Sequence, residues 1–261
     1  MRRARAPLLA LLAALGPPAA AMTMPAPERY GHVTLDRATR QAQVPPVGFE
    51  HWRHRAQFTC RLCHVDIGFA MRAGASEVSA DTNREGYHCG ACHDGKRRFR
   101  GKPIFAACDG TRQVEPGSAC ARCHRPEDGA RARREYDLAT QGLPRNWAGL
   151  VDWERAEAAG TIRPADFLQG ISIKRDVIQN QREIVIPSRA GWMSSVLFSH
   201  PKHAVWNGCE VCHPDIFPNV GGQERRYTML GINAGEACGA CHVKVAFPLA
   251  ECERCHVKPV Q

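Results

Sequence analysis

The same five-residue pattern, Cys-x-x-Cys-His, occurs six times in this chain of 261 residues. It uses twelve of the 13 cysteines: Cys60, Cys63, Cys89, Cys92, Cys120, Cys123, Cys209, Cys212, Cys238, Cys241, Cys252 and Cys255. The histidines that close the six motifs are His64, His93, His124, His213, His242 and His256. The fold must therefore suit six copies of one chemical group.

The histidine after each cysteine pair indicates which chemistry the motif serves. A structural zinc site places no demand on the residue after the second cysteine, and a disulfide framework gives no reason for six such histidines. With 12 His in 261 residues, six by chance have a probability on the order of 10⁻⁸, whereas C-x-x-C-H is the attachment signature of c-type haem. The sequence predicts six covalently bound haem c groups, whose irons take the motif histidines as proximal ligands.

The first 21 residues have the three parts of a secretory signal peptide. They begin with three arginines, continue with a short apolar run over residues 8–15, and end in three alanines at residues 19–21. The apolar run is too short to span a bilayer, and no later segment is long enough. We expect cleavage of residues 1–21 and export of the mature chain to the periplasm, with extracellular and outer-membrane-associated locations as open alternatives.

Composition indicates what stabilises the fold. Leu, Ile, Val and Phe total 50 of the 261 residues, about 19%, which is below the level at which a chain of this size builds an apolar core. Six porphyrins would supply the missing apolar surface, so we expect a haem-dependent fold. The formal net charge of +9 falls to +6 without the three signal-peptide arginines. Each ferric haem with ionised propionates adds about −1, and the resulting near-neutral protein is not expected to bind nucleic acid.

The second half of the chain repeats the first at an offset of 149 residues. FEHWRHRAQFTCRLCH at residues 49–64 matches FSHPKHAVWNGCEVCH at 198–213, and both halves then reach CGACH and a third motif. Apolar stretches at 33–35 and 184–186 predict a small two-stranded β-ribbon in each half. We expect one triheme module at 22–124 and another at 181–261. The connector at 125–180 is expected to be loop apart from one short helix ending at Gly160.

The order F-x-H-x-x-H, C-x-x-C-H, CGACH and C-x-x-C-H resembles the triheme module of cytochrome c7, within the cytochrome c3 superfamily. Its tandem occurrence resembles the nanowire-type multidomain c7 chains, over residues 30–124 and 184–256. The resemblance implies a multihaem cytochrome c with mostly irregular backbone, short helices and two c7-like modules. It also implies electron transfer through closely packed, low-spin, six-coordinate haems rather than catalysis.

The resemblance further implies which side chains are the distal iron ligands. Histidines at i and i+3 share one face of a helical turn, and in the family the two cap different irons of one module. The pairs implied are His51 with His64, His54 with His93, His200 with His213, and His203 with His242.

The third haem of each module then still lacks a distal ligand. Met229 lies in the segment that supplies the family's last distal ligand, and thioether sulfur is a known haem ligand, so we expect it to cap the haem of His256. In the first module, the residue aligned with Met229 is Ala80, so the correspondence between the modules gives no ligand there. We take His88 as the ligand of the His124 haem, with Met71 and His32 as open alternatives.

Cys108 is the cysteine outside the motifs, and we expect either a partly buried thiol or a bond between two chains. The expected partners are other redox proteins, such as periplasmic or outer-membrane cytochromes, and self-association stays open. Two other functions also stay open. One is an oxidoreductase with an open iron, and the other is a subunit of a cytochrome filament.

Overall fold

The computed structural model describes residues 24–108, 114–115, 117–176, 181–218 and 227–258, which form only short elements joined by turns. The expected signal peptide lies outside these residues. No helix of the described ranges is long and apolar enough to cross a membrane. The α-helices are α1 (Arg37–Ala42), α2 (His51–Arg55), α3 (Ala80–Arg84), α4 (Gly129–Ala139), α5 (Trp153–Ala158), α6 (His200–Asn207), α7 (Met229–Asn233) and α8 (Gly239–His242). Short 3-10 or π-helical turns lie at Pro27–Arg29, Leu62–Asp66, His88–Ala91, Cys120–Arg122 and Cys252–Arg254.

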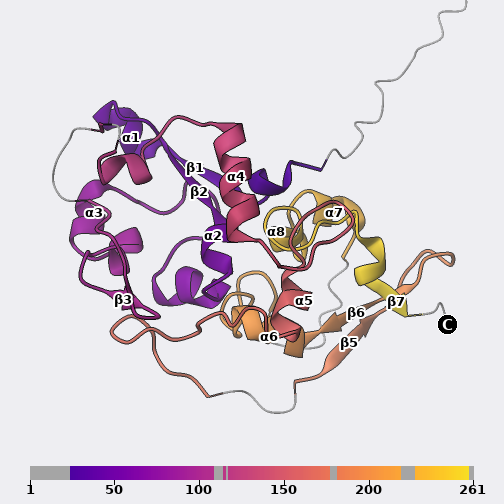
Figure 1. The fold of residues 1–261 in the computed structure, drawn as a ribbon. Coiled ribbons are helices and arrows are strands. Elements are labelled where there is room, and N and C mark those ends of the chain that lie inside the picture. The colour runs from indigo at the N-terminus through magenta and orange to yellow at the C-terminus, as the bar shows by residue number, and fades with distance from the viewer. Residues whose placement is uncertain (1–23, 109–113, 116, 177–180, 219–226, 259–261) are drawn as a thin grey trace, which may run out of the picture.

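The strands form three small antiparallel sheets (Figure 1). Their bounds are β1 (His32–Leu35), β2 (Val47–Glu50), β3 (Arg98–Phe99), β4 (Lys102–Pro103), β5 (Glu183–Ile186), β6 (Ser195–Ser199) and β7 (His256–Lys258). The expected ribbons are present as β1–β2 and β5–β6, with Val33 opposite Phe49 and Ile184 opposite Phe198. Each ribbon leads directly into the helix that carries H-x-x-H, so the pairing of the strands sets where that helix begins.

The expectation of two strands per module is wrong for the second half, where β7 joins β6 as a third strand. This strand starts at the histidine of the last motif, with His256 opposite Val196. The first half has the same pairing as a single bridge between His124 and Val47. Val47 and Val196 are 149 residues apart, which is the offset of the internal repeat. The repeat therefore includes the contact between the third motif and the ribbon in each half.

The connector contains more regular structure than the sequence indicated. Besides α5, which ends two residues before Gly160, it contains the eleven-residue helix α4. The side chain of Asp128 caps α4 by accepting a hydrogen bond from the Arg131 backbone amide. The sequence of α4 is mostly polar, and Tyr136 is its buried residue, so it lacks the apolar periodicity that predicts a helix.

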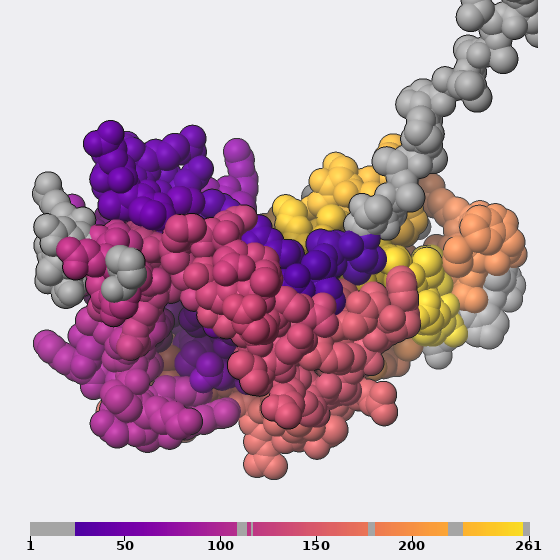
Figure 2. Space-filling view, turned by 45° about the horizontal axis from the view of Figure 1, so that its top comes forward, coloured from indigo at the N-terminus to yellow at the C-terminus, as the bar shows by residue number. Residues whose placement is uncertain are grey.

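The connector also supplies five of the nine buried apolar side chains of the described residues. One cluster joins Tyr136 and Val151 of the connector to Trp52 of α2, and another joins Ala156 and Ile162 to Trp206 of α6. In the space-filling view, the pink-to-salmon connector extends along both the indigo N-terminal part and the yellow C-terminal part (Figure 2). The connector therefore holds the two halves together rather than merely linking them.

Ion pairs connect α5 and the following loop to both halves. Glu154 pairs with Lys202 of α6 and, at 2.6 Å, with Arg254 near the third motif of the second half. On the other side, Asp166 pairs at 2.8 Å with Arg61, which is 2% exposed and lies inside the first motif. These contacts fix the haem motifs of the two halves relative to the connector.

Candidate functional site

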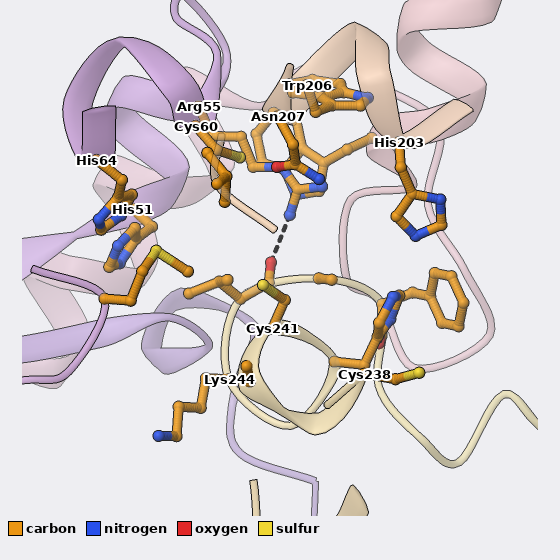
Figure 3. Close-up of a pocket in the computed structure, with 18 of the residues that line it drawn as sticks. His51, Arg55, Cys60, His64, His203, Trp206, Asn207, Cys238, Cys241 and Lys244 are labelled. Carbon is orange, nitrogen blue, oxygen red and sulfur yellow. Dashed lines mark hydrogen bonds between the residues drawn. The ribbon is translucent and has the colours of Figure 1, made fainter. Parts of the chain in front are cut away.

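One cavity of about 1930 Å³ runs through both halves of the molecule (Figure 3). Its lining includes motif residues from each half, such as Cys63, His64, His93, Cys241 and His256. A pocket for one drug-sized molecule usually measures about 300–1,000 Å³. This cavity is therefore large enough for several flat apolar groups that lie close to one another.

All six motif histidines are oriented in the same way, because the Nδ1 of each hydrogen-bonds a backbone carbonyl oxygen. The acceptors for His64, His93, His124, His213, His242 and His256 are, in order, Phe69, Phe105, Pro45, Phe217, Phe247 and Ser194, at 2.6–3.3 Å. A carbonyl oxygen only accepts, so Nδ1 must carry the ring hydrogen, and Nε2 keeps a lone pair. Metal-bound histidines usually have this arrangement.

Four of these acceptors are phenylalanines, a feature that the sequence analysis missed. The rings of Phe105 and Phe247 also lie against the histidines they orient, with ring centroids 4.4 and 4.3 Å apart. The repeat carried a signal for two others, since VDIGF follows His64 directly and PDIF follows His213. The phenylalanine ends the turn that brings its carbonyl back to the imidazole.

Three of the four expected histidine pairs face each other. The ring centroids are 6.4 Å apart for His51 and His64, 6.3 Å for His54 and His93, and 6.2 Å for His203 and His242. Figure 3 shows the first of these pairs side by side. Between His200 and His213, both among the described residues, no comparable ring contact is found.

The spacing of the facing pairs fits one iron between two imidazoles. A bond from imidazole nitrogen to a metal such as zinc is about 2.0 Å long. Two such bonds on opposite sides of one ion span about 4 Å, and the half-widths of two rings account for the remaining 2 Å or so. The residues present therefore fit haem iron held by two histidines.

Three of the four H-x-x-H histidines are oriented like the motif histidines, whereas the buried Nδ1 of His54 has no hydrogen-bond partner among the described residues. His51, His200 and His203 hydrogen-bond the carbonyl oxygens of Gly31, Arg182 and Ser199 through Nδ1. In each half the preceding phenylalanine contacts both histidines. The ring centroid of Phe49 is 4.9 and 4.8 Å from those of His51 and His54, and Phe198 repeats this at 4.8 and 4.4 Å. The phenylalanine of F-x-H-x-x-H thus fixes the directions in which the two imidazoles point.

Protonation states in the cavity suit haem attachment. Burial lowers the pKa of His54 and of His242 to about 4, so both are neutral and able to bind a metal at pH 7. Burial raises the pKa of the Cys63, Cys89 and Cys241 thiols to about 12. Within the described ranges, no three His, Cys, Asp or Glu side chains converge as a zinc site would require.

The distal ligands of the third haems are less well placed. Met229 begins α7, is 47% exposed and lines the same cavity as His256. His88 has a φ of 49°, and its ring centroid is 5.1 Å from that of Phe69. The carbonyl oxygen of Phe69 accepts the hydrogen bond of His64. His88, which packs against the Phe69 ring, therefore lies close to the first motif. Met71 is 39% exposed and also lines the cavity.

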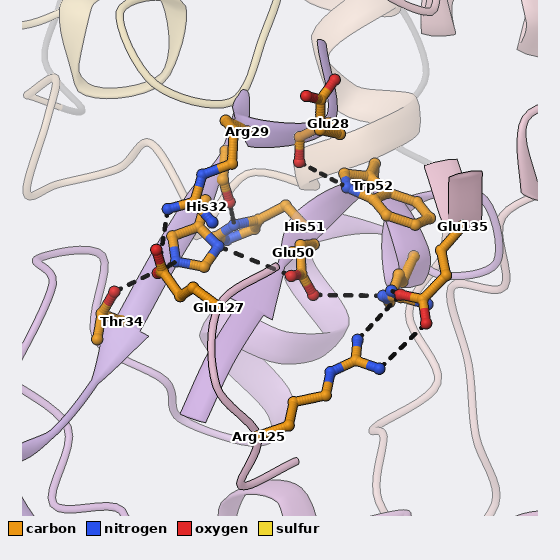
Figure 4. A network of polar contacts seen from close by, with 12 residues as sticks. Glu28, Arg29, His32, Thr34, Glu50, His51, Trp52, Arg125, Glu127 and Glu135 are labelled. Carbon is orange, nitrogen blue, oxygen red and sulfur yellow. Dashed lines mark hydrogen bonds and ion pairs between the residues drawn. The ribbon is translucent and has the colours of Figure 1, made fainter. Parts of the chain in front are cut away.

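His32, the other alternative for the His124 haem, faces away from the cavity. Its Nε2 lies 3.3 Å from Glu127 and 3.2 Å from the Thr34 hydroxyl, and its Nδ1 lies 3.8 Å from Glu50 (Figure 4). Both ring nitrogens are thus directed into a polar network at the β1–β2 edge, which makes His32 a poor candidate for an iron ligand.

Cys108 is half-buried, and its sulfur lies 3.9 Å from the side-chain nitrogen of Asn83. It is also close enough to Cys89 and Cys123 to raise the pKa of both thiols, although burial is the larger cause. Cys108 therefore lies between the second and third motifs of the first half.

Comparison with known proteins agrees with this geometry. The sequence model described as "Cytochrome c7 and related cytochrome c" matches residues 47–132 and 196–257. No curated protein matches the chain. Among solved structures, the C-terminal hexaheme fragment of GSU1996 is 22% identical, with 90% of this chain and 99% of that chain covered and a TM-score of 0.26.

The N-terminal hexaheme fragment of the same protein is 23% identical, covers 87% and 98% of the two chains, and has a TM-score of 0.26. The dodecaheme cytochrome c GSU1996 is 21% identical, covers 87% and 74%, and has a TM-score of 0.27. These TM-scores are too low for the similarity to carry residue assignments. The two matched segments together span more than half of the chain, which therefore belongs to the cytochrome c7 family of multihaem c-type cytochromes.

Proposed function

We propose that this chain is an exported hexahaem cytochrome that passes electrons between redox partners in the periplasm. The observation that carries the proposal is the common orientation of the six motif histidines. Each binds a carbonyl oxygen through Nδ1, which leaves six Nε2 atoms available as proximal ligands.

The side chains have distinct roles in holding the cofactors. The paired cysteines would hold the porphyrin covalently, and each motif histidine would supply one nitrogen ligand to an iron. Haem, when bound, supplies one-electron chemistry between ferric and ferrous iron. The H-x-x-H histidines supply the second nitrogen at three facing pairs, and we retain His200 as the partner of His213. With two nitrogen ligands each, these irons have no open position for a substrate.

Close spacing supports electron transfer within the molecule. His51 and His54 belong to one helix of five residues, α2, yet face two different motif histidines. Two irons held by one short helix must be neighbours. The cavity runs on into the second half, so a path between the modules need not pass through bulk water.

The module boundaries remain part of the proposal. We assign residues 22–124 and 181–261 to the two triheme modules, 125–180 to the connector, and 1–21 to the signal peptide. The packing of the connector against Trp52 and Trp206 makes the two modules one structural unit.

Purified holoprotein tests this function. Mass spectrometry should give the mature chain plus six haems, and the visible spectrum of the reduced form should not change under carbon monoxide. Fewer haems would contradict the stoichiometry. Carbon monoxide binding would favour an oxidoreductase, for which the third haems are the candidates because no described histidine ring faces His124 or His256.

A further inference from the structure

Arg55 lies where the two modules meet (Figure 3). It ends α2, and its guanidinium donates a hydrogen bond to the carbonyl oxygen of Val245 in the second module. The guanidinium carbon lies 5.3 Å from the ring centroid of Trp153 and 5.0 Å from that of Trp206. Arg55 therefore contacts the connector and the second module at one point, with cation–π contacts on both sides.

The charge of Arg55 is not balanced by a carboxylate of the described residues. Neighbouring arginines differ: Arg53 pairs with Glu50 and Glu135, and Arg254 pairs with Asp152, Glu154 and Glu251. The Nε of Arg55 is buried and has no hydrogen-bond partner among the described residues. A guanidinium stays protonated in proteins, so a full positive charge remains in a region with little water.

Arg55 is close to one expected iron ligand on each side of the junction. Gly31, whose carbonyl oxygen accepts the hydrogen bond of His51, packs against Val245, since a Cβ on Gly31 would lie 3.4 Å from the Val245 side chain. Val245, which accepts the hydrogen bond of Arg55, follows His242 by three residues.

The attachment cysteines of the same two motifs also lie beside Arg55 (Figure 3). Cys60 packs against the cluster of Trp206, whose ring the guanidinium contacts, and the Val245 amide donates a hydrogen bond to the Cys241 carbonyl oxygen. Cys60 belongs to the motif of His64, and Cys241 to the motif of His242. The side chain of Arg55 thus lies between the attachment points of one haem from each module.

We propose that Arg55 raises the reduction potentials of the haems bound at His64 and His242 and makes this pair the crossing point between the modules. The inference rests on the proposed electron-transfer function. A nearby cation stabilises the reduced state, whose iron carries one positive charge fewer, and low polarity strengthens the effect. In the crossing step one ferrous iron becomes ferric as its electron reduces the ferric iron opposite. No proton or atom is transferred.

The test is a redox titration of the holoprotein, followed by visible absorption, for wild type and Arg55→Met. Two of six haems hold about a third of the absorbance. We expect that third to move to lower potential by at least a tenfold change in the reduction equilibrium, about 59 mV for one electron. Arg55→Lys, which keeps the charge, should titrate close to wild type.

Arg134→Met is the matched control, because it removes one positive charge from an exposed position of α4. It should leave the curve unchanged. A curve for Arg55→Met that superimposes on wild type, or a uniform shift of all six haems, would overturn the proposal. If Arg55→Met yields no holoprotein, the same titration can compare Arg55→Gln, which removes the charge, with Arg55→Lys, which keeps it. Wild-type haems that bind carbon monoxide would instead contradict the underlying function, so the two failures are distinguishable.

Discussion

A histidine offers iron only one ring nitrogen, and in this chain a backbone carbonyl engages the other nitrogen of nine histidines. These are the six motif histidines together with His51, His200 and His203. A carbonyl fixes both the tautomer and the ring direction, so Nε2 is the nitrogen that keeps the lone pair. The fold thus decides which nitrogen each histidine presents to iron.

His203→Ala should convert one haem to high spin while the others stay low spin. Removal of the imidazole that faces His242 leaves that iron with one protein ligand and an open position. EPR and carbon monoxide binding would measure the change, and His54→Ala should act alike on the haem of His93. His32→Ala is the control, because its ring nitrogens face Glu50 and Glu127. If His203→Ala gives no high-spin signal, the H-x-x-H assignment is wrong.

Met229→His should keep the haem of His256 low spin but lower its potential. Thioether sulfur is a weaker donor to ferric iron than imidazole, and histidine–methionine ligation raises the potential. Met229→Ala should leave that iron high spin and able to bind carbon monoxide. Spectroelectrochemistry of both variants measures the spin state and the reduction potential of this haem. Unchanged spectra and potentials in both would mean that Met229 only packs in the cavity.

At the scale of elements, close contact with the preceding backbone explains why the second residue of CGACH is glycine in both modules. A Cβ on Gly90 would lie 1.7 Å from the carbonyl oxygen of Asn83, and one on Gly239 would lie 1.8 Å from that of Ile232. In both modules the contact spans seven residues. The two motifs therefore pack their first turn directly on a backbone, where no side chain fits.

Gly239→Ala should destabilise the holoprotein, because the obstructing atom is backbone and cannot swing aside. Overpacking of this kind typically costs about 1–3 kcal/mol, and Gly90→Ala should behave alike. The melting temperatures of the wild-type and variant holoproteins measure this loss of stability. Gly129→Ala is the control, since nothing lies within 4 Å of its added carbon. Equal melting temperatures for Gly239→Ala and wild type would show that the helix shifts without cost.

Several elements followed from the sequence, and others did not. The two ribbons were predictable because an apolar stretch, at 33–35 and at 184–186, precedes each F-x-H-x-x-H segment. The α4 helix was not, since its stability comes from the Asp128 cap and from Tyr136 against Trp52. Strand β7 was also missed, because its pairing with β6 depends on the return of the last motif. Contacts between distant segments leave no local pattern.

The candidate site also contains residues that could be predicted from the sequence and contacts that could not. Motif spacing was enough to name the six proximal histidines and the six cysteine pairs as candidates. The carbonyl acceptors and the position of Arg55 depend on how the chain turns back, and RHRAQF gives no sign that its second arginine meets Val245. The resemblance supplied the partners of the H-x-x-H histidines, and in three of those pairs the ring centroids lie 6.2–6.4 Å apart.

At the scale of the whole molecule, the protein core is too small to hold the chain together. Within the described ranges, nine apolar side chains are buried, and the two clusters contain three buried residues each. We expect the haem-free chain, with all motif cysteines replaced by serine, to lack a cooperative thermal transition. Circular dichroism against temperature would show this. A cooperative transition with native-like NMR dispersion would contradict a haem-dependent fold.

The central claim is that six low-spin haems with two protein ligands each share one electron-transfer path. A redox titration of the holoprotein with optical and EPR detection tests it most directly, because it counts the haems and types their ligands in one sample. We predict six one-electron equivalents, low-spin signals throughout, and no high-spin ferric signal at full oxidation. A high-spin signal of one haem equivalent or more, or fewer than six equivalents, would contradict the account.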